Sequence, residues 1–299
     1  MAQGIPRKHH YLPIFYSKQW AGDDGKVVRF HRPYQTIIDR RIAPAGVGWK
    51  EDLYKVDGLI GPDQQALEVQ YFSRLDDVAA RVHRKLIASP LEPLEPIDVN
   101  DWTHFMLSLL HRTPHFIDET RKFGLATWRK LTLDPDLVDR AVSRGHHPDT
   151  AREYLTSLTD EDGLHSTMIT LPQLIASRRV IELVHNFHWA HYDVPEGSPD
   201  LLLSDCPVFL SNGLDNPSGH LAMPLSPQRM VVMAKERRVI EDLNRENPKH
   251  IVKRMNRLTV RSAREFVVAT DLSQERFISR HFAADPAQSL VGRASQLRS

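Results

Sequence analysis

The chain has 299 residues, of which 41% are hydrophobic and 26% charged, as is typical of a globular protein with a sizeable core. A net charge of +1 excludes a strong global field, so any contact with nucleic acid depends on a local basic face. The single cysteine, Cys206, excludes an intramolecular disulfide and a zinc site built from cysteines. Neither a signal peptide nor an apolar run long enough to span a bilayer is present, which predicts a cytoplasmic protein.

The N-terminal quarter predicts a small β-rich unit. Pro13 opens a short helical segment, and Asp23-Asp24-Gly25 indicates a tight turn before the first strand. Glycines punctuate the text that follows. The expected elements are one or two helical turns at 14–21 and strands at 26–30, 35–40 and 53–56.

The middle of the chain predicts helices. Residues 64–88 carry one apolar stripe at three- and four-residue steps, and the Pro-rich stretch 89–96 ends that helix. A second helix is expected from about 98 to 112 and continues, past a kink at Pro114, through 128. The polar stretch 132–166 predicts an insertion or lid, and 172–186 predicts another helix.

The C-terminal third predicts several short strands and one helix. Apolar runs indicate strands at 188–194, 201–203, 221–225, 229–233 and 266–269, and a helix at 248–263. The fold class is therefore α+β, a mainly antiparallel sheet built from N- and C-terminal strands and packed with a central set of helices. We expect one domain over 1–282 and a flexible tail at 283–299.

The first candidate site residues are His9 and His10, next to the apolar, Pro-fixed turn Tyr11-Leu12-Pro13. Adjacent side chains of an extended segment point to opposite faces, so the two imidazoles do not bind one metal together. One of them is expected to act as general base or single metal ligand while the other holds the segment down. The alternative is that a histidine only hydrogen-bonds the scaffold.

Two carboxylates are candidate metal ligands and catalytic groups. Asp205 follows the apolar strand 201–203, and the ends of rigid strands are common places for catalytic carboxylates. The alternative for Asp205 is an Asx-turn before Pro207. Glu68 lies at the border of the apolar stripe in the 64–88 helix, where it faces either a site or solvent near the helix N-terminus.

Arg112 ends an apolar helix beside Thr113-Pro114. It is a candidate for clamping a phosphate or carboxylate, and the alternative is a structural arginine that bonds helix carbonyls. The last helix is also basic, which makes RNA or DNA a possible partner there. A solvated face paired with nearby glutamates is the alternative. The basic residues are Lys253, Arg254, Arg257, Arg261 and Arg264.

The motifs together resemble the family known as domain of unknown function 4238, over residues 9–269. The similarity is carried by the residues 9–13 with Phe15, Glu68, the residues 112–114, the residues 204–207 and 224–227, and Asn256 with Ala263. Cys206 departs from the family, which usually has Ser-Asp-Asn-Pro at this segment, so the position does not require an amide. The resemblance implies a single domain and no particular substrate.

Two functional hypotheses follow. The first is a metal-dependent phosphodiester hydrolase, such as a nuclease-like effector, in which a histidine is the base and Arg112 neutralises the phosphate. In this hypothesis Asp205 and Glu68 hold Mg²⁺ or Mn²⁺. The second is a non-enzymatic binding or regulatory module in which the same residues form a pocket or a structural network. An open cleft favours the enzyme, whereas buried and mutually satisfied groups favour the module.

Overall fold

The computed structural model of the chain describes residues 6–132, 134, 136–145 and 147–287, and it has the predicted mixed α+β fold. The strands are β1 (Lys8–His10), β2 (Val27–His31), β3 (Ile38–Ile42), β4 (Trp49–Glu51), β5 (His188–Asp193), β6 (Leu203–Ser204), β7 (Phe209–Ser211), β8 (His220–Ser226), β9 (Arg229–Ala234) and β10 (Phe266–Ala269). The α-helices are α1 (Ile14–Ser17), α2 (Ser73–Ile87), α3 (Pro96–His111), α4 (Pro114–Thr132), α5 (Leu137–Ser143), α6 (Pro148–Ser157), α7 (Asp160–Ile169), α8 (Leu171–Ile175), α9 (Arg178–His185), α10 (Arg237–Arg245), α11 (Pro248–Ser262) and α12 (Glu275–His281).

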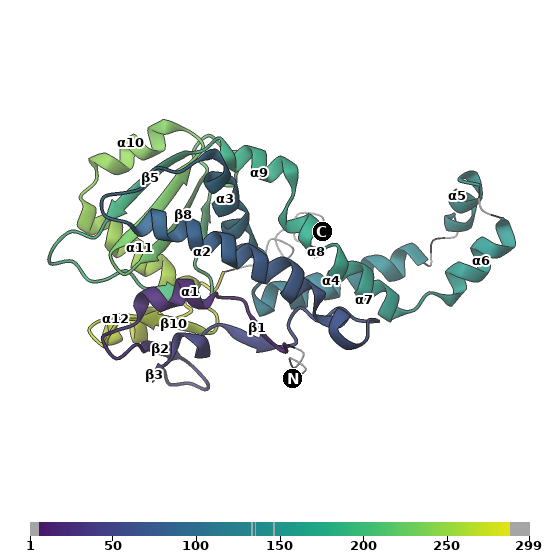
Figure 1. The fold of residues 1–299 in the computed structure, drawn as a ribbon, viewed down its shortest axis with the longest axis horizontal. Helices are drawn as coiled ribbons and strands as arrows, with labels where there is room; N and C mark the ends of the chain where they lie inside the picture. Colours follow the sequence, from purple (N-terminus) through teal and green to yellow (C-terminus); the bar gives the residue numbers. More distant parts are fainter. Residues whose placement is uncertain (1–5, 133, 135, 146, 288–299) are drawn as a thin grey trace.

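The strands form three antiparallel sheets. β1 pairs with β4 in an N-terminal ribbon. A second sheet, which we call the β2–β10 sheet, has the order β3-β2-β10-β6, and the C-terminal sheet has the order β5-β9-β8-β7. In the β2–β10 sheet Phe266 lies opposite His31, and Val267 lies opposite Ser204. Strands from both ends of the chain therefore meet in one sheet, as predicted (Figure 1).

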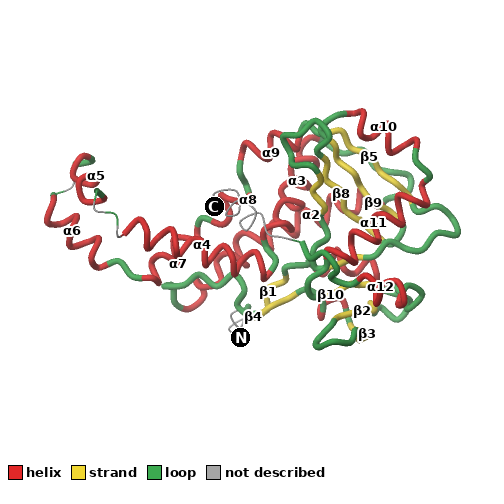
Figure 2. Tube along the Cα trace, turned by 180° about the vertical axis from the view of Figure 1, so that it is seen from behind, coloured by secondary structure: helices red, strands yellow, loops and turns green. Residues whose placement is uncertain are grey.

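The C-terminal sheet is covered on both faces, because successive side chains of a strand point to opposite sides. On β8, Leu221 and Met223 belong to the main core, which also takes residues of α2 and α3, whereas Ala222 packs with α10 and α11. Figures 1 and 2 show these helix pairs from opposite sides of the molecule. The sheet is thus the central layer of this half of the protein.

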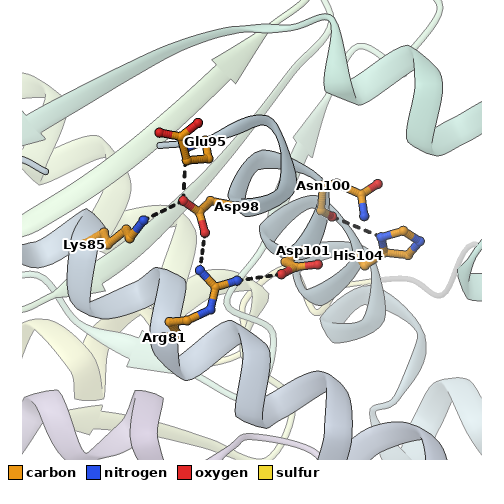
Figure 3. A network of polar contacts seen from close by, with 7 residues as sticks. All are labelled: Arg81, Lys85, Glu95, Asp98, Asn100, Asp101 and His104. Carbon is orange, nitrogen blue, oxygen red and sulfur yellow. Dashed lines mark hydrogen bonds and ion pairs between the residues drawn. The ribbon is translucent and has the colours of Figure 1, made fainter. Parts of the chain in front are cut away.

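A buried carboxylate joins α2 to α3. Asp98 accepts from Lys85 Nζ at 2.8 Å, pairs with Arg81, and accepts the Glu95 backbone N–H at 3.0 Å (Figure 3). The Lys85 bond, the Glu95 N–H and Arg81 lower the pKa of Asp98 to about 2. Arg81 also reaches Asp101 at 2.8 Å. These bonds fix how α2 lies against α3.

The expected helix at 64–88 is three segments rather than one. A 3₁₀ turn at Gly61–Gln65 and a π-helix at Leu67–Phe72 precede α2. A π-helix is wider than an α-helix, and such turns are frequent at functional sites. The segment carries Glu68 and Tyr71, which belong to the polar cluster described below.

Two further segments differ from the sequence-based expectation. Residues 53–56 form a turn, not a strand, and the strand of this region is β4. The physical reason is that the Tyr54 backbone N–H bonds the His9 side chain instead of a neighbouring strand. The helix expected at 172–186 is divided into α8 and α9 around 176–177. Of the expected tail, residues 288–299 lie outside the described residues.

The predicted insertion at 132–166 coincides with a projecting arm. Figures 1 and 2 show α5 and α6 at the far end of this arm, which is built on α4 and α7. α4 and α7 approach closely, because a Cβ at Gly163 would lie 2.6 Å from the Trp128 ring, and one at Gly124 only 2.1 Å from Thr167. A lid function for the arm stays a prediction.

Candidate functional site

His9 is fully buried on β1 between two backbone groups. The Tyr54 N–H donates to His9 Nδ1 at 2.9 Å, so the proton resides on Nε2, which lies 3.3 Å from the Pro6 carbonyl oxygen. The imidazole also stacks on the Tyr54 ring, with centroids 5.4 Å apart. Burial lowers the pKa of His9, which favours the neutral ring. His9 therefore holds β1 against the 52–56 turn.

The segment after β1 lies directly on Gly48. The Tyr11 and Leu12 backbone N–H groups donate to the Gly48 carbonyl oxygen at 2.9 and 3.1 Å. Gly48 has a φ of +59°, and a Cβ there would lie 2.4 Å from the Leu12 Cβ. Only glycine fits this position without a shift of the backbone. The contact fixes how the Tyr11-Leu12 backbone lies against Gly48.

Five side chains from four segments form what we call the polar cluster: His10, Glu68, Tyr71, Asp76 and Arg112. Arg112 is fully buried and donates from Nη1 to Asp76 Oδ1 at 2.8 Å. The His10 backbone N–H lies against the Glu68 carboxyl group. Four buried atoms of the cluster have no hydrogen-bond partner among the described residues, namely Glu68 Oε2, Tyr71 Oη, and Arg112 Nε and Nη2.

Two carboxyl groups of the polar cluster have pKa values near neutral pH. Burial and the nearby Asp76 raise the pKa of Glu68 to about 7, although Arg112 and the His10 N–H oppose the rise. Burial likewise raises the pKa of Asp76 to about 6 against the Arg112 charge. Groups that exchange protons near pH 7 are characteristic of acid–base sites and also of buried ion networks. Both kinds of site fit these pKa shifts, and Arg112 itself is shielded from solvent.

Asp205 is bound by backbone groups of a distant segment. Its carboxylate accepts the N–H of Arg264 at 3.0 Å, of Glu265 at 3.2 Å and of Phe266 at 3.5 Å. The side chain is only 3% exposed, and burial raises its pKa to about 6. Asp205 therefore fixes the start of β10 next to the end of β6.

The structure thus brings three of the predicted residues together, namely His10, Glu68 and Arg112. Asp205 and His9 belong to separate networks, and their interactions do not include Glu68. Among the described residues, no group of three or more His, Cys, Asp or Glu side chains is arranged to hold a metal ion. The catalytic and metal-binding assignments stay predictions.

A second polar region, which the sequence analysis did not predict, is a pocket of about 470 Å³ beside Tyr11. We call it the basic pocket. Arg29 and His31 of β2 point to the same side, and Arg264 and Glu265 line the pocket from the chain just before β10. Arg32 and Trp49 also line the pocket.

The basic pocket contains a cation that forms no hydrogen bond or ion pair with any residue that the structure describes. This is Arg29, whose Nε atom is buried although the residue as a whole is half-buried. Burial lowers the pKa of Arg29, while Tyr11 and Glu265 oppose that change. His31 has a buried, unpartnered Nδ1, and burial together with the Arg29 charge lowers its pKa. The half-buried Arg29 guanidinium is attracted by Glu265 without a hydrogen bond to it, so a bound anion would offset more of the cost of its partial burial.

One of the basic residues expected on the helix at 248–263 lies in this region instead. α11 ends at Ser262, so Arg264 lies beyond it, where it lines the basic pocket and donates from Nε to the Ala287 carbonyl oxygen at 2.5 Å. Arg254 is paired with Glu246 at 2.8 Å. Contact of the helix itself with nucleic acid stays a prediction.

The fold and the site define an α+β protein with a buried polar cluster and a separate basic pocket. Residues 8–273 match the family described as "Protein of unknown function (DUF4238)", and the chain belongs to that family. No curated protein and no solved structure matches the chain. Among the helices that the structure describes, none is long and apolar enough to cross a membrane.

Proposed function

We propose that this protein binds a phosphodiester-bearing ligand, single-stranded RNA or DNA, in the basic pocket. The observation that carries the proposal is the Arg29 guanidinium on the wall of an open pocket that also contains Arg32 and Arg264, because no described residue forms a hydrogen bond or ion pair with it. Guanidinium groups match phosphate oxygens in geometry as well as charge. The pocket carries three arginines against one carboxylate, so its local charge differs from the near-neutral whole chain.

An aromatic ring at the rim supports a nucleic acid rather than a small anion. Trp49 is 43% exposed, and the Lys8 ammonium lies 4.6 Å from its ring centroid. A base stacked on an exposed ring, with cations on both sides for the backbone, is the usual arrangement in proteins that bind single strands. β4 presents Trp49 opposite His10 of β1, so the rim is built on the N-terminal ribbon.

Hydrolysis of the bound phosphodiester is a narrower proposal, favoured by one observation in the polar cluster. The carboxyl group of Glu68, with a pKa of about 7, lies against His10, whose strand partner is Trp49 of the pocket rim. Glu68 does not line the basic pocket, so it would act as general base on a strand that extends from the pocket past Trp49 to His10. A Mg²⁺ or Mn²⁺ ion held by Glu68 and Asp205 would have to join two separate networks, so this proposal gives the base role to Glu68 alone.

Fluorescence anisotropy with labelled single-stranded DNA and RNA of about 12 nucleotides tests the binding proposal. We expect Arg29→Ala and Trp49→Ala each to weaken binding by about tenfold, because each removes one of the two recognition elements. Arg178→Ala is the matched control, since Arg178 is 91% exposed and pairs only with Glu182. Wild-type protein that does not bind at low salt, or variants that bind equally well, would refute the proposal.

The same labelled strands, incubated with Mg²⁺ or Mn²⁺ and separated on a denaturing gel, test hydrolysis. Cleavage that Glu68→Gln abolishes while binding persists would support the catalytic base. Binding without any cleavage would leave the protein a binding module and overturn the hydrolase.

A further inference from the structure

Among the described strands, β7 is the edge strand of the C-terminal sheet and has one free side. Within that part of the chain it pairs only with β8, in the register Phe209 to Ala222, Leu210 to Leu221 and Ser211 to His220. In an antiparallel pair, alternate residues direct their N–H and C=O groups away from the partner strand. Outside the β8 pairing, no described residue forms a backbone hydrogen bond with Phe209–Ser211. Such an edge is a template for one more strand.

A groove of about 1140 Å³ runs along this edge and offers apolar contacts on both faces of the sheet. Phe209 and Leu243 belong to the layer under α10 and α11, whereas Leu110 and Leu210 belong to the main core on the opposite face. An added strand sends successive side chains to opposite faces, so both sets would gain contacts. The groove therefore has the shape that an extended peptide requires.

The groove is acidic. Four acidic and two basic side chains line it, and both basic groups are already neutralised, Arg254 by Glu246 at 2.8 Å and Arg238 by Asp242 at 4.0 Å. The two remaining acids are Glu236, which precedes α10, and Asp285 on the opposite wall. Neither forms an ion pair with any residue in the described part of the chain.

We propose that the groove along β7 binds an extended, basic peptide as an additional antiparallel or parallel strand. The main-chain groups of β7 supply the hydrogen bonds, and the apolar residues of the two faces take alternate side chains of the peptide. Glu236 and Asp285 select lysine or arginine at its ends. This peptide site is distinct from the basic pocket, whose charge is of the opposite sign and would repel the same ligand.

The test uses the full chain and a fluorescein-labelled peptide, Lys-Lys-Leu-Val-Leu-Lys-Lys, with Glu in place of Lys as the charge control. Two further peptides carry N-methyl groups, one on both leucines and one on the valine. Only one of these two sets of amides faces β7, because alternate amides of a strand point in opposite directions. We expect one methylated peptide to bind about tenfold more weakly than the parent and the other to bind like the parent.

Charge variants of the protein test the choice of peptide. Glu236→Lys and Asp285→Lys should each weaken binding of the Lys peptide, whereas Glu153→Lys on exposed α6 should leave its affinity unchanged. Equal tolerance or equal loss for the two methylated peptides would overturn strand addition. Unchanged affinity in both groove variants would overturn the basic partner. Self-association that the groove variants abolish, without binding of the Lys peptide, would overturn the proposal in favour of a second copy of the chain.

Discussion

The polar cluster makes the stability of the protein depend on pH in a direction set by Glu68. Burial raises the pKa of Glu68 from its ordinary value of 4.5 to about 7 in the folded protein. The folded state therefore holds a proton that the unfolded chain releases at lower pH. It follows that stability falls as the pH rises from about 4.5 through about 7 and is then constant for this group. Glu68→Gln, which is neutral throughout, removes this dependence.

The size of the effect follows from the shift. The full change from 4.5 to about 7 corresponds to about 3 kcal/mol, and screening at a carboxyl that solvent partly reaches reduces it to about 1–2 kcal/mol. We therefore expect the unfolding free energy of Glu68→Gln, relative to wild type, to rise by about 1–2 kcal/mol between about pH 5 and pH 8. Because this is a difference, any constant cost of the substitution cancels.

Urea unfolding of both proteins at several pH values measures this quantity. Glu153→Gln on exposed α6 is the control and should show no such pH dependence. A difference between Glu68→Gln and wild type that stays constant from about pH 5 to pH 8 would refute the reasoning, because it would mean that Glu68 titrates alike in the folded and unfolded states.

Three other outcomes are expected. Gly48→Ala should lower the unfolding free energy by about 2 kcal/mol or more, because the added Cβ meets Leu12. Gly25→Ala, which is also at positive φ but in open space, should lower it by about 1 kcal/mol. Equal losses of the two variants in denaturant unfolding would argue against a close packing contact at Gly48. Asp205→Ala should lower the unfolding free energy by about 2–4 kcal/mol, measured by the same method, because it leaves several buried N–H groups without an acceptor. Calorimetry with Mn²⁺ checks the alternative, because metal binding lost in an Asp205→Ala protein of normal stability would make Asp205 a ligand. Arg29→Ala should reduce the slope of the logarithm of the oligonucleotide binding constant against the logarithm of the salt concentration by about 0.7. An unchanged slope would mean that the phosphates bind elsewhere.

The sequence predicted best what depends on local pattern. The apolar stripe of 64–88 located α2, and β2, β8, β9 and β10 follow from short apolar runs between turn signals. The π-helix was not predictable in this way, because one extra residue per turn hardly changes the spacing of a stripe. α10 was missed although Val239, Ile240 and Leu243 have helical spacing, so a signal was present. β7 is too short to give one.

The candidate site was less predictable because its partners are far apart in the chain. Asp205 was recognised as a polar residue at a strand end, but the N–H groups that it binds lie about 60 residues later. The basic pocket was not predictable from the sequence for a similar reason. Arg29 and His31 lie on one face of β2, which is a readable signal. Arg264 joins them through the pairing of β10 with β2, and Trp49 lies on β4, which pairs with β1.

The strand pairing of the β2–β10 sheet also sets the order in which the strands can pair while the chain is being synthesised. β2 ends at residue 31, yet its inner neighbour β10 begins at residue 266, and β6 depends on β10 as well. Contacts between such distant segments are slow to form, and they carry a large loop-closure cost. Until the ribosome has released residue 269, one side of β2 has no strand to pair with. The nascent chain therefore exposes a hydrophobic strand for most of its translation, a state in which chaperones commonly act.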